Sequence, residues 1–229
     1  MKLITIPDLH GKDYWKSIDP ELYDKIIFLG DYVDSKKQYS NAQELANLEA
    51  IIQFKLSFPG KVIMLLGNHD IQYLHYPQFS CSNPNYEIQK ALTSIFQSNK
   101  SLFQVAWQYE NHLWTHAGVS NCWFREYIFY KIDHSIQDKK DLADFLNTLH
   151  QSHPEILATV GPQRKGHAHY GGIFWADKSE TENDYLNGYH QYVGHTKVQV
   201  ILKNERDADS SISFLDCLNS QITFLVTDL

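Results

Sequence analysis

The sequence has few of the residues on which several classes of protein depend. Its three cysteines, Cys81, Cys122 and Cys217, are an odd number without Cys-x-x-Cys spacing. This pattern argues against both a disulfide framework and a zinc ribbon. The apolar stretch before Pro7 is too short for the core of a signal peptide, and no later run reaches the length of a membrane helix. We therefore expect a cytoplasmic protein without a membrane-spanning segment.

Positive charge is scarce as well. Twenty Lys and Arg residues stand against 27 Asp and Glu, so the formal net charge is −7. Such a protein has no electrostatic basis for stable binding to nucleic acid. If it handles phosphate groups, it needs a local source of positive charge, and bound metal ions would provide one.

The composition is otherwise that of a folded protein. Hydrophobic residues make up 43% of the chain, and its 14 Tyr and 12 Phe argue against disorder. The length is suited to one domain that spans residues 1–229.

The first third of the chain alternates strand and helix signals. LITIP (3–7), KIIFLG (25–30) and KVIMLLG (61–67) are apolar runs of strand length, and residues 41–58 have helical periodicity. Continuous apolar strands with a helix between them predict a parallel sheet that is covered on both faces. Further along, we expect helices at 86–97 and 139–149, a loop at 161–172, and strands at 102–108, 112–118, 197–203, 211–216 and 221–228.

Residues of the metal-ligand type repeatedly follow these apolar runs. Because the carboxyl ends of parallel strands lie at one edge of a sheet, five segments would bring their side chains to a common place. Carboxylate and imidazole groups, with no cysteine nearby in sequence, favour Mn, Fe or Zn. Asp31 is the candidate to bridge two cations, and Asp70 either supports the site or caps the next helix. The candidates are Asp8, His10, Asp31, Asp34, Asn68, His69, Asp70, His116 and His195.

The ordered set of motifs resembles the calcineurin-like metallophosphoesterase superfamily. Its members here are Asp8-Leu9-His10, the GDYVD segment (30–34), the GNHD segment (67–70), His116 in THAG, and Gly194-His195. The GDYVD and THAGVS segments resemble the PPP-type branch, which includes serine/threonine protein phosphatases and bacterial diadenosine tetraphosphate hydrolases. The resemblance implies a four-layer α-β-β-α sandwich of two mixed sheets, with a dinuclear metal site at the carboxyl ends of strands.

The resemblance also implies a role for each matching residue. Two divalent ions are expected, Mn first and Fe or Zn as alternatives, and a hydroxide that bridges them would attack phosphorus. His69 would protonate the leaving group, oriented by Asp34. The implied metal ligands are Asp8 and His10 for one ion, Asp31 for both, and Asn68, His116 and His195 for the other.

Two departures from the family pattern affect the phosphate-binding residues and the last ligand. Ser35 stands where the PPP branch has an arginine that holds phosphate. Of the three arginines in the chain, Arg164 is our first candidate to replace it and Arg125 the second. A second Gly-His segment contains His167 and His169, and we favour His195 as the ligand because it follows an apolar strand.

The implied reaction leaves the substrate open. The first hypothesis is hydrolysis of a phosphomonoester on a phosphorylated protein. The alternative is hydrolysis of a dinucleoside polyphosphate or another nucleotide, in which Trp175 could stack on a base. A third, non-enzymatic hypothesis is a metal-poor scaffold that binds proteins, but such a scaffold typically loses His69 or the bridging carboxylate.

Overall fold

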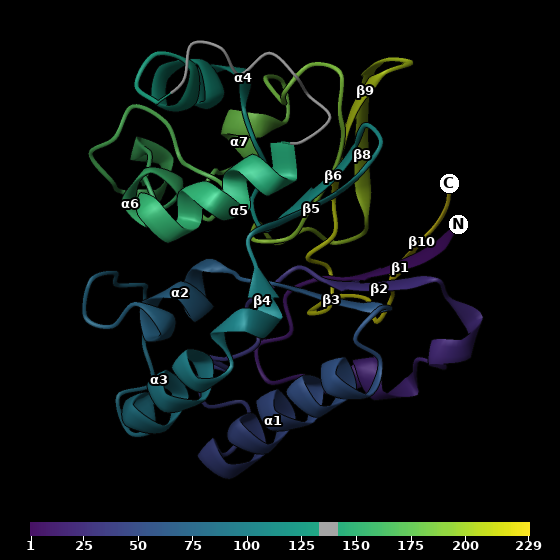
Figure 1. Ribbon diagram of the computed structural model, residues 1–229, viewed down its shortest axis with the longest axis vertical. Helices are drawn as coiled ribbons and strands as arrows, with labels where there is room; N and C mark the ends of the chain where they lie inside the picture. The colour runs from purple at the N-terminus through teal and green to yellow at the C-terminus, as the bar shows by residue number, and fades with distance from the viewer. Residues whose placement is uncertain (133–141) are drawn as a thin grey trace.

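Two five-stranded mixed sheets lie face to face in the middle of the molecule, with helices on both outer faces (Figure 1). This computed structural model describes residues 1–132 and 142–229, and it confirms the predicted four-layer α-β-β-α sandwich. The first sheet has the order β10 (Leu225–Asp228), β1 (Lys2–Ile6), β2 (Lys25–Phe28), β3 (Val62–Leu65) and β4 (Phe103–Gln104). The second has the order β5 (Ala106–Tyr109), β6 (His112–Thr115), β7 (His190–Val193), β9 (Ser210–Phe214) and β8 (Leu202–Asp207).

Strands β1 to β4 run parallel, as predicted for the first third of the chain, and β10 pairs with β1 in the antiparallel direction. The two chain ends therefore lie side by side (Figure 1). In the second sheet β6, β7 and β9 are parallel, while β5 and β8 are antiparallel to their neighbours at its edges.

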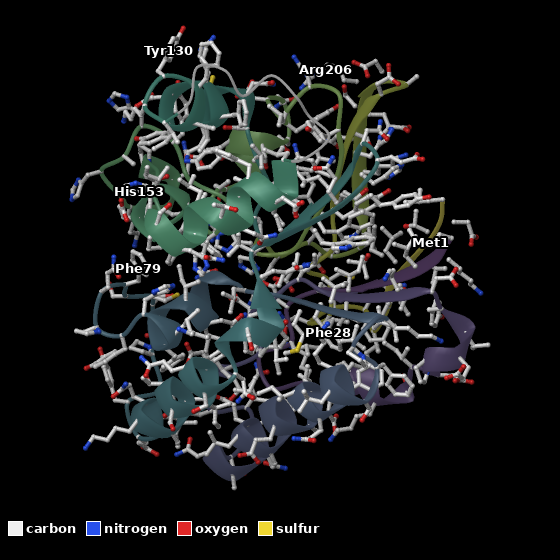
Figure 2. The ribbon with its side chains drawn as sticks, viewed as in Figure 1. Met1, Phe28, Phe79, Tyr130, His153 and Arg206 are labelled. Carbon is white, nitrogen blue, oxygen red and sulfur yellow. The ribbon has the colours of Figure 1, made fainter. Side chains whose placement is uncertain are left out.

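Helices cover the outer face of each sheet. On the first sheet lie α1 (Asn41–Ser57), α2 (Asn68–Leu74) and α3 (Gln89–Ser98), and Phe28 points into the core beside α1 (Figure 2). α1 begins at a capping box of Ser40 and Gln43, and it buries residues at helical spacing. Over the second sheet lie α4 (Asn121–Trp123), a π-helical segment (Phe124–Phe129), α5 (Leu142–Ser152), α6 (Pro154–Leu157) and α7 (Lys178–Thr181).

The two sheets bury an apolar layer between them. Leu3, Ile27, Leu29 and Leu65 from the first sheet meet Trp114 and Tyr192 from the second, together with Leu215. Trp114 Nε1 also donates a hydrogen bond across the layer to Thr5 Oγ1, at 3.0 Å. Burial on both faces explains why the central strands are apolar without alternation.

Several predicted elements differ from the observed ones. The predicted strand 102–108 is divided at Val105, where the chain passes from β4 in the first sheet to β5 in the second. Most of the predicted strand 197–203 is irregular, because Val198 N donates to Asp216 O instead of to a neighbouring strand. The first three residues of the predicted helix 139–149 lie outside the described residues. Among residues 1–132 and 142–229, no helix is long and apolar enough to span a bilayer.

Candidate metal centre

The predicted ligands lie on the loops that leave one edge of the two sheets. β1, β2 and β3 end together in the first sheet, and β6 and β7 end together in the second. His195 N donates to both carboxylate oxygens of Asp8, at 3.0 Å each, and thereby joins the two sheets. The fold thus brings together Asp8, His10, Asp31, Asn68, His116 and His195, the six predicted ligands.

Asp31 lies at the centre of this cluster. Its Oδ2 is 3.6 Å from His10 Nε2, and its Oδ1 is 3.6 Å from His116 Nε2. The described residues contain two groups that could each hold a metal ion: His10, Asp31 and His69, and Asp8, Asp31 and His116. Their possible ligand atoms lie within 4.8 Å of one another in each group, and Asp31 belongs to both. This geometry fits the bridging position that the sequence predicts for it.

Asn68 lies between two of the histidines. Its Oδ1 is 2.9 Å from His116 Nε2 and 2.9 Å from His195 Nδ1. Three groups with available lone pairs therefore point to one place, which is the arrangement that a cation requires.

The orientation of two histidines supports the same conclusion. His10 Nδ1 donates to Val33 O and His116 Nδ1 donates to Leu29 O, each at 2.8 Å. Because these backbone contacts hold the proton on Nδ1, each Nε2 is left with its lone pair directed at the cluster.

The charges of the cluster also fit bound cations. Asp8 and Asp31 are 1% and 2% exposed, and neither forms an ion pair with Lys or Arg among the described residues. Burial raises the pKa of the Asp8 carboxyl. Burial acts in the same direction on Asp31, but the surrounding His116, His69 and His10 bring its pKa below the ordinary value. Divalent ions would provide the positive charge that these buried carboxylates lack.

The backbone at the strand ends is strained. His10, Asp31, Asp34 and His195 have φ angles of 45°, 52°, 63° and 62°, in the left-handed region. A non-glycine residue in this region costs roughly 1–3 kcal/mol, and such strain is concentrated at functional sites.

Asp70 holds this strained backbone in place. Its carboxylate accepts hydrogen bonds from the backbone N–H groups of Asp31 at 2.7 Å, Tyr32 at 3.1 Å and Gly67 at 2.8 Å. Gly67 is the N-cap residue of α2 and Asp70 its N3 residue, so the same carboxylate both supports the site and completes the capping box of the helix. A side chain on Gly67 would place Cβ 2.1 Å from Asp31 Oδ1, so this position must remain glycine.

His69 and Asp34 form a buried hydrogen-bonded pair beside the cluster. His69 Nδ1 donates to Asp34 Oδ2 at 2.7 Å, and the same carboxylate accepts from Gln72 Nε2 and Tyr73 Oη. Burial opposes protonation of His69, but the Asp31 charge and the bond to Asp34 raise the pKa of its imidazole well above the usual value. The Asp31 and Asp34 carboxylates therefore both favour the protonated form of His69.

Comparison with known proteins places the chain in a family. Residues 1–202 match the family model of the calcineurin-like phosphoesterases. The chain belongs to this family. It is therefore a metal-dependent phosphoesterase, as the sequence motifs predict.

Solved structures share the fold of this phosphoesterase. A cold-active protein-tyrosine phosphatase from a psychrophilic Shewanella species is 16% identical, with a TM-score of 0.59, and the match covers 98% of this chain and 74% of that one. A protein serine/threonine phosphatase from Saccharomyces cerevisiae is 15% identical, with a TM-score of 0.52, over 94% of this chain and 66% of that one. No curated protein sequence matches the chain significantly.

The two candidate arginines of the phosphoesterase lie in different places. Arg164 Nη2 donates to Thr196 Oγ1 at 2.6 Å, directly after His195, and its Nε lies 2.7 Å from Asp177 Oδ2. Arg125 contacts Cys122 and lines a separate cavity of about 650 Å³, whose described lining contains none of the other predicted site residues. The structure therefore brings Arg164, but not Arg125, to the edge of the cluster.

The histidines of the second Gly-His segment are outside the cluster. His167 is exposed, and His169 Nδ1 pairs with Glu126 Oε1 at 3.1 Å on the surface. Trp175, in contrast, packs against His195 with its ring centre 5.8 Å away.

Sequence reasoning did not identify the residues that surround His69. Gln72, Tyr73 and Cys81 all contact the His69–Asp34 pair or its neighbours. Gln72 and Tyr73 follow His69 by one helical turn, and that spacing could have indicated their proximity. Nothing in the sequence indicates Cys81, which reaches the site only through the path of its loop.

Proposed function

We propose that this phosphoesterase hydrolyses phosphomonoesters on phosphorylated proteins. The observation that carries the proposal is the position of Asp31, which is shared by two adjoining groups of possible metal ligands, one of which includes His69 of the His69–Asp34 pair. Two divalent cations, Mn²⁺ first and Fe or Zn as alternatives, would be held by Asp8, His10, Asp31, Asn68, His116 and His195.

The cations, when bound, would activate water for attack on phosphorus and offset the charge that develops on the phosphoryl oxygens. His69 would then donate its proton to the oxygen of the leaving group. Asp34 fixes the orientation and tautomer of the imidazole, because it accepts the Nδ1 proton and leaves Nε2 to face the substrate. The Asp31 and Asp34 carboxylates favour the protonated form of His69, which is the form that can donate the proton.

Arg164 would bind the phosphoryl oxygens. Its contacts with Asp177 and Thr196 hold the guanidinium next to His195, and a planar guanidinium can donate two parallel hydrogen bonds to phosphate. This assignment compensates for Ser35, which cannot provide positive charge.

A large cavity next to His69 supports a protein substrate. It has a volume of about 1010 Å³, and its wall includes Asp34, which is bonded to His69, and Cys81, which is bonded to Asn68. Lys36 and Lys37 line it too, and neither forms an ion pair within the described part of the chain. We infer that the peptide on either side of a phosphorylated side chain occupies this cavity, with acidic neighbours preferred.

Trp175 favours a second candidate, hydrolysis of dinucleoside polyphosphates or other nucleotides. Its indole lies against His195 and could stack on a base. The scaffold hypothesis has less support, because His69 and Asp31 are both present in a geometry that suits catalysis.

Substrate profiling tests the proposal. The purified protein is first analysed for metal and then assayed, after loading with Mn²⁺, on p-nitrophenyl phosphate, phosphopeptides, nucleotides and diadenosine polyphosphates. We expect two bound ions and the highest kcat/KM on phosphopeptides, with Asp31→Asn as the inactive control. Greatest activity on diadenosine polyphosphates would favour the second candidate, and a protein that binds no metal and hydrolyses none of these would refute both.

A further inference from the structure

A cysteine sulfur lies between a proposed metal ligand and the proposed acid. Cys81, in the loop between α2 and α3, is partly buried and lines the cavity next to His69. Asn68 Nδ2 donates to Cys81 Sγ at 2.9 Å. The same sulfur raises the pKa of the nearby His69 imidazole, whose Nδ1 is bonded to Asp34.

The contact with Asn68 determines which end of its amide faces the cluster. Only Oδ1 can bind a cation, and it faces His116 Nε2 and His195 Nδ1 at 2.9 Å each. Rotation of the amide by half a turn would direct its NH₂ group there instead. Within the described residues, the Cys81 sulfur is the one hydrogen-bond acceptor for Asn68 Nδ2, so it opposes this rotation.

Cys81 is itself fixed by the same network. Its backbone N–H donates to Gln72 Oε1 at 3.1 Å, and Gln72 Nε2 donates to Asp34 Oδ2 at 2.6 Å. The sulfur is therefore held in register with the His69–Asp34 pair.

We propose that Cys81 is a positioning residue: its sulfur accepts the hydrogen bond from Asn68 Nδ2 and thereby directs Asn68 Oδ1 toward the cation that His116 and His195 would hold. This inference rests on the proposed function, because it assumes that Asn68 is a metal ligand.

Metal binding and NMR test the proposal independently of turnover. Titration of the metal-free protein with Mn²⁺, followed by calorimetry and by the spin-coupled EPR signal of a metal pair, is compared for wild type, Cys81→Ser, Cys81→Ala and Cys81→Val. Serine keeps an acceptor, alanine removes it, and valine removes it while filling the space. Cys122→Ala, at a part-buried cysteine outside the cluster, is the matched control.

We expect Cys81→Ala and Cys81→Val to weaken binding of one of the two ions by about 10–100-fold, the usual effect of removing a group that orients a ligand. The side-chain NH₂ resonances of Asn68 should shift in both variants, while Cys81→Ser and Cys122→Ala remain close to wild type. Unchanged affinity and an unchanged resonance in Cys81→Ala would overturn the proposal, as would an equal loss in Cys81→Ser. If wild type binds two ions but hydrolyses no phosphate ester, the proposed function fails while these binding results still decide the role of Cys81.

Discussion

Replacing Asp34 with Asn tests the proposed acid most directly. The Asp34 side chain is fully buried, and it accepts hydrogen bonds from His69 Nδ1 at 2.7 Å, Gln72 Nε2 at 2.6 Å, Tyr73 Oη at 2.5 Å and Asn85 N at 3.2 Å. Asparagine has the same shape but no charge. The NH₂ group of its amide cannot accept a hydrogen bond from any of these donors.

The size of the effect follows from the loss of this charge. An opposite charge in direct contact typically moves a pKa by about 1–3 units, which corresponds to roughly 1.4–4 kcal/mol. His69 must be protonated to act as an acid, so activity falls as the pH rises through its pKa, which Asp31 and Asp34 raise. Asp34→Asn should therefore lower kcat by about 10–10³-fold and move the alkaline limb of the pH profile to lower pH by about 1–3 units.

The assay measures kcat against pH for two substrates with the Mn²⁺-loaded enzyme. Phenyl phosphate has a poorer leaving group than p-nitrophenyl phosphate, so it depends more on protonation and should lose more activity. Tyr73→Phe is the matched control, because it removes one hydrogen bond to Asp34 while the carboxylate keeps its charge. An alkaline limb that stays in place in Asp34→Asn, with equal losses on both substrates, would refute the assignment of His69 as the acid.

Three further predictions concern the phosphate clamp, the metals and the acid stability. Arg164→Ala should raise the KM for substrate and the inhibition constant for phosphate by about tenfold or more, because charge-assisted hydrogen bonds of about 1.5–3 kcal/mol are lost. Arg125→Ala should leave both constants near wild type. The reverse result in product-inhibition assays would exchange the roles of the two arginines. Removing metal with EDTA should lower the thermal unfolding temperature, and returning Mn²⁺ to about 100 times its Kd should restore about 2.7 kcal/mol per site; an unchanged unfolding temperature in calorimetry would argue against a metal site. Burial lowers the pKa of His150 to about 4 in the folded protein. As the pH drops from about 6.5 towards 4, the unfolded chain binds a proton at His150 while the folded protein does not, so the free energy of unfolding falls. His150→Leu should reduce that loss by up to roughly 3 kcal/mol in denaturant unfolding at pH 4.5, and an equal loss in both proteins would contradict it.

The sequence predicts the first sheet and the proximity of the candidate ligands for the same reason. An apolar run that is buried on both faces is recognisable from a few residues, and the polar residue that ends it must lie at the carboxyl edge of the sheet. Asp8, Asp31 and Asn68 each follow such a run, and the fold brings them together. Their positions depend on local pattern and on one property of parallel sheets.

Predictions that relied on apolar content alone were less accurate. Residues 102–108 look like one strand, yet Val105 is where the chain changes sheets, and such a change leaves no mark in the hydrophobic pattern. Residues 197–201 have the composition of a strand, but the backbone N–H of Val198 donates to Asp216 O and not to a neighbouring strand. The pairing partner, and not the composition, decides whether an apolar segment becomes a strand.

The sequence by itself indicates the reaction class and the candidate site residues, because both depend on side-chain chemistry and on short spacings along the chain. The surroundings of those residues come from the packing of distant loops. Packing brings Arg164 to Thr196, next to His195, and leaves Arg125 at another cavity, and it brings the Cys81 sulfur to Asn68. Contacts of this kind depend on the path of each loop through space, and no periodicity along the chain records that path.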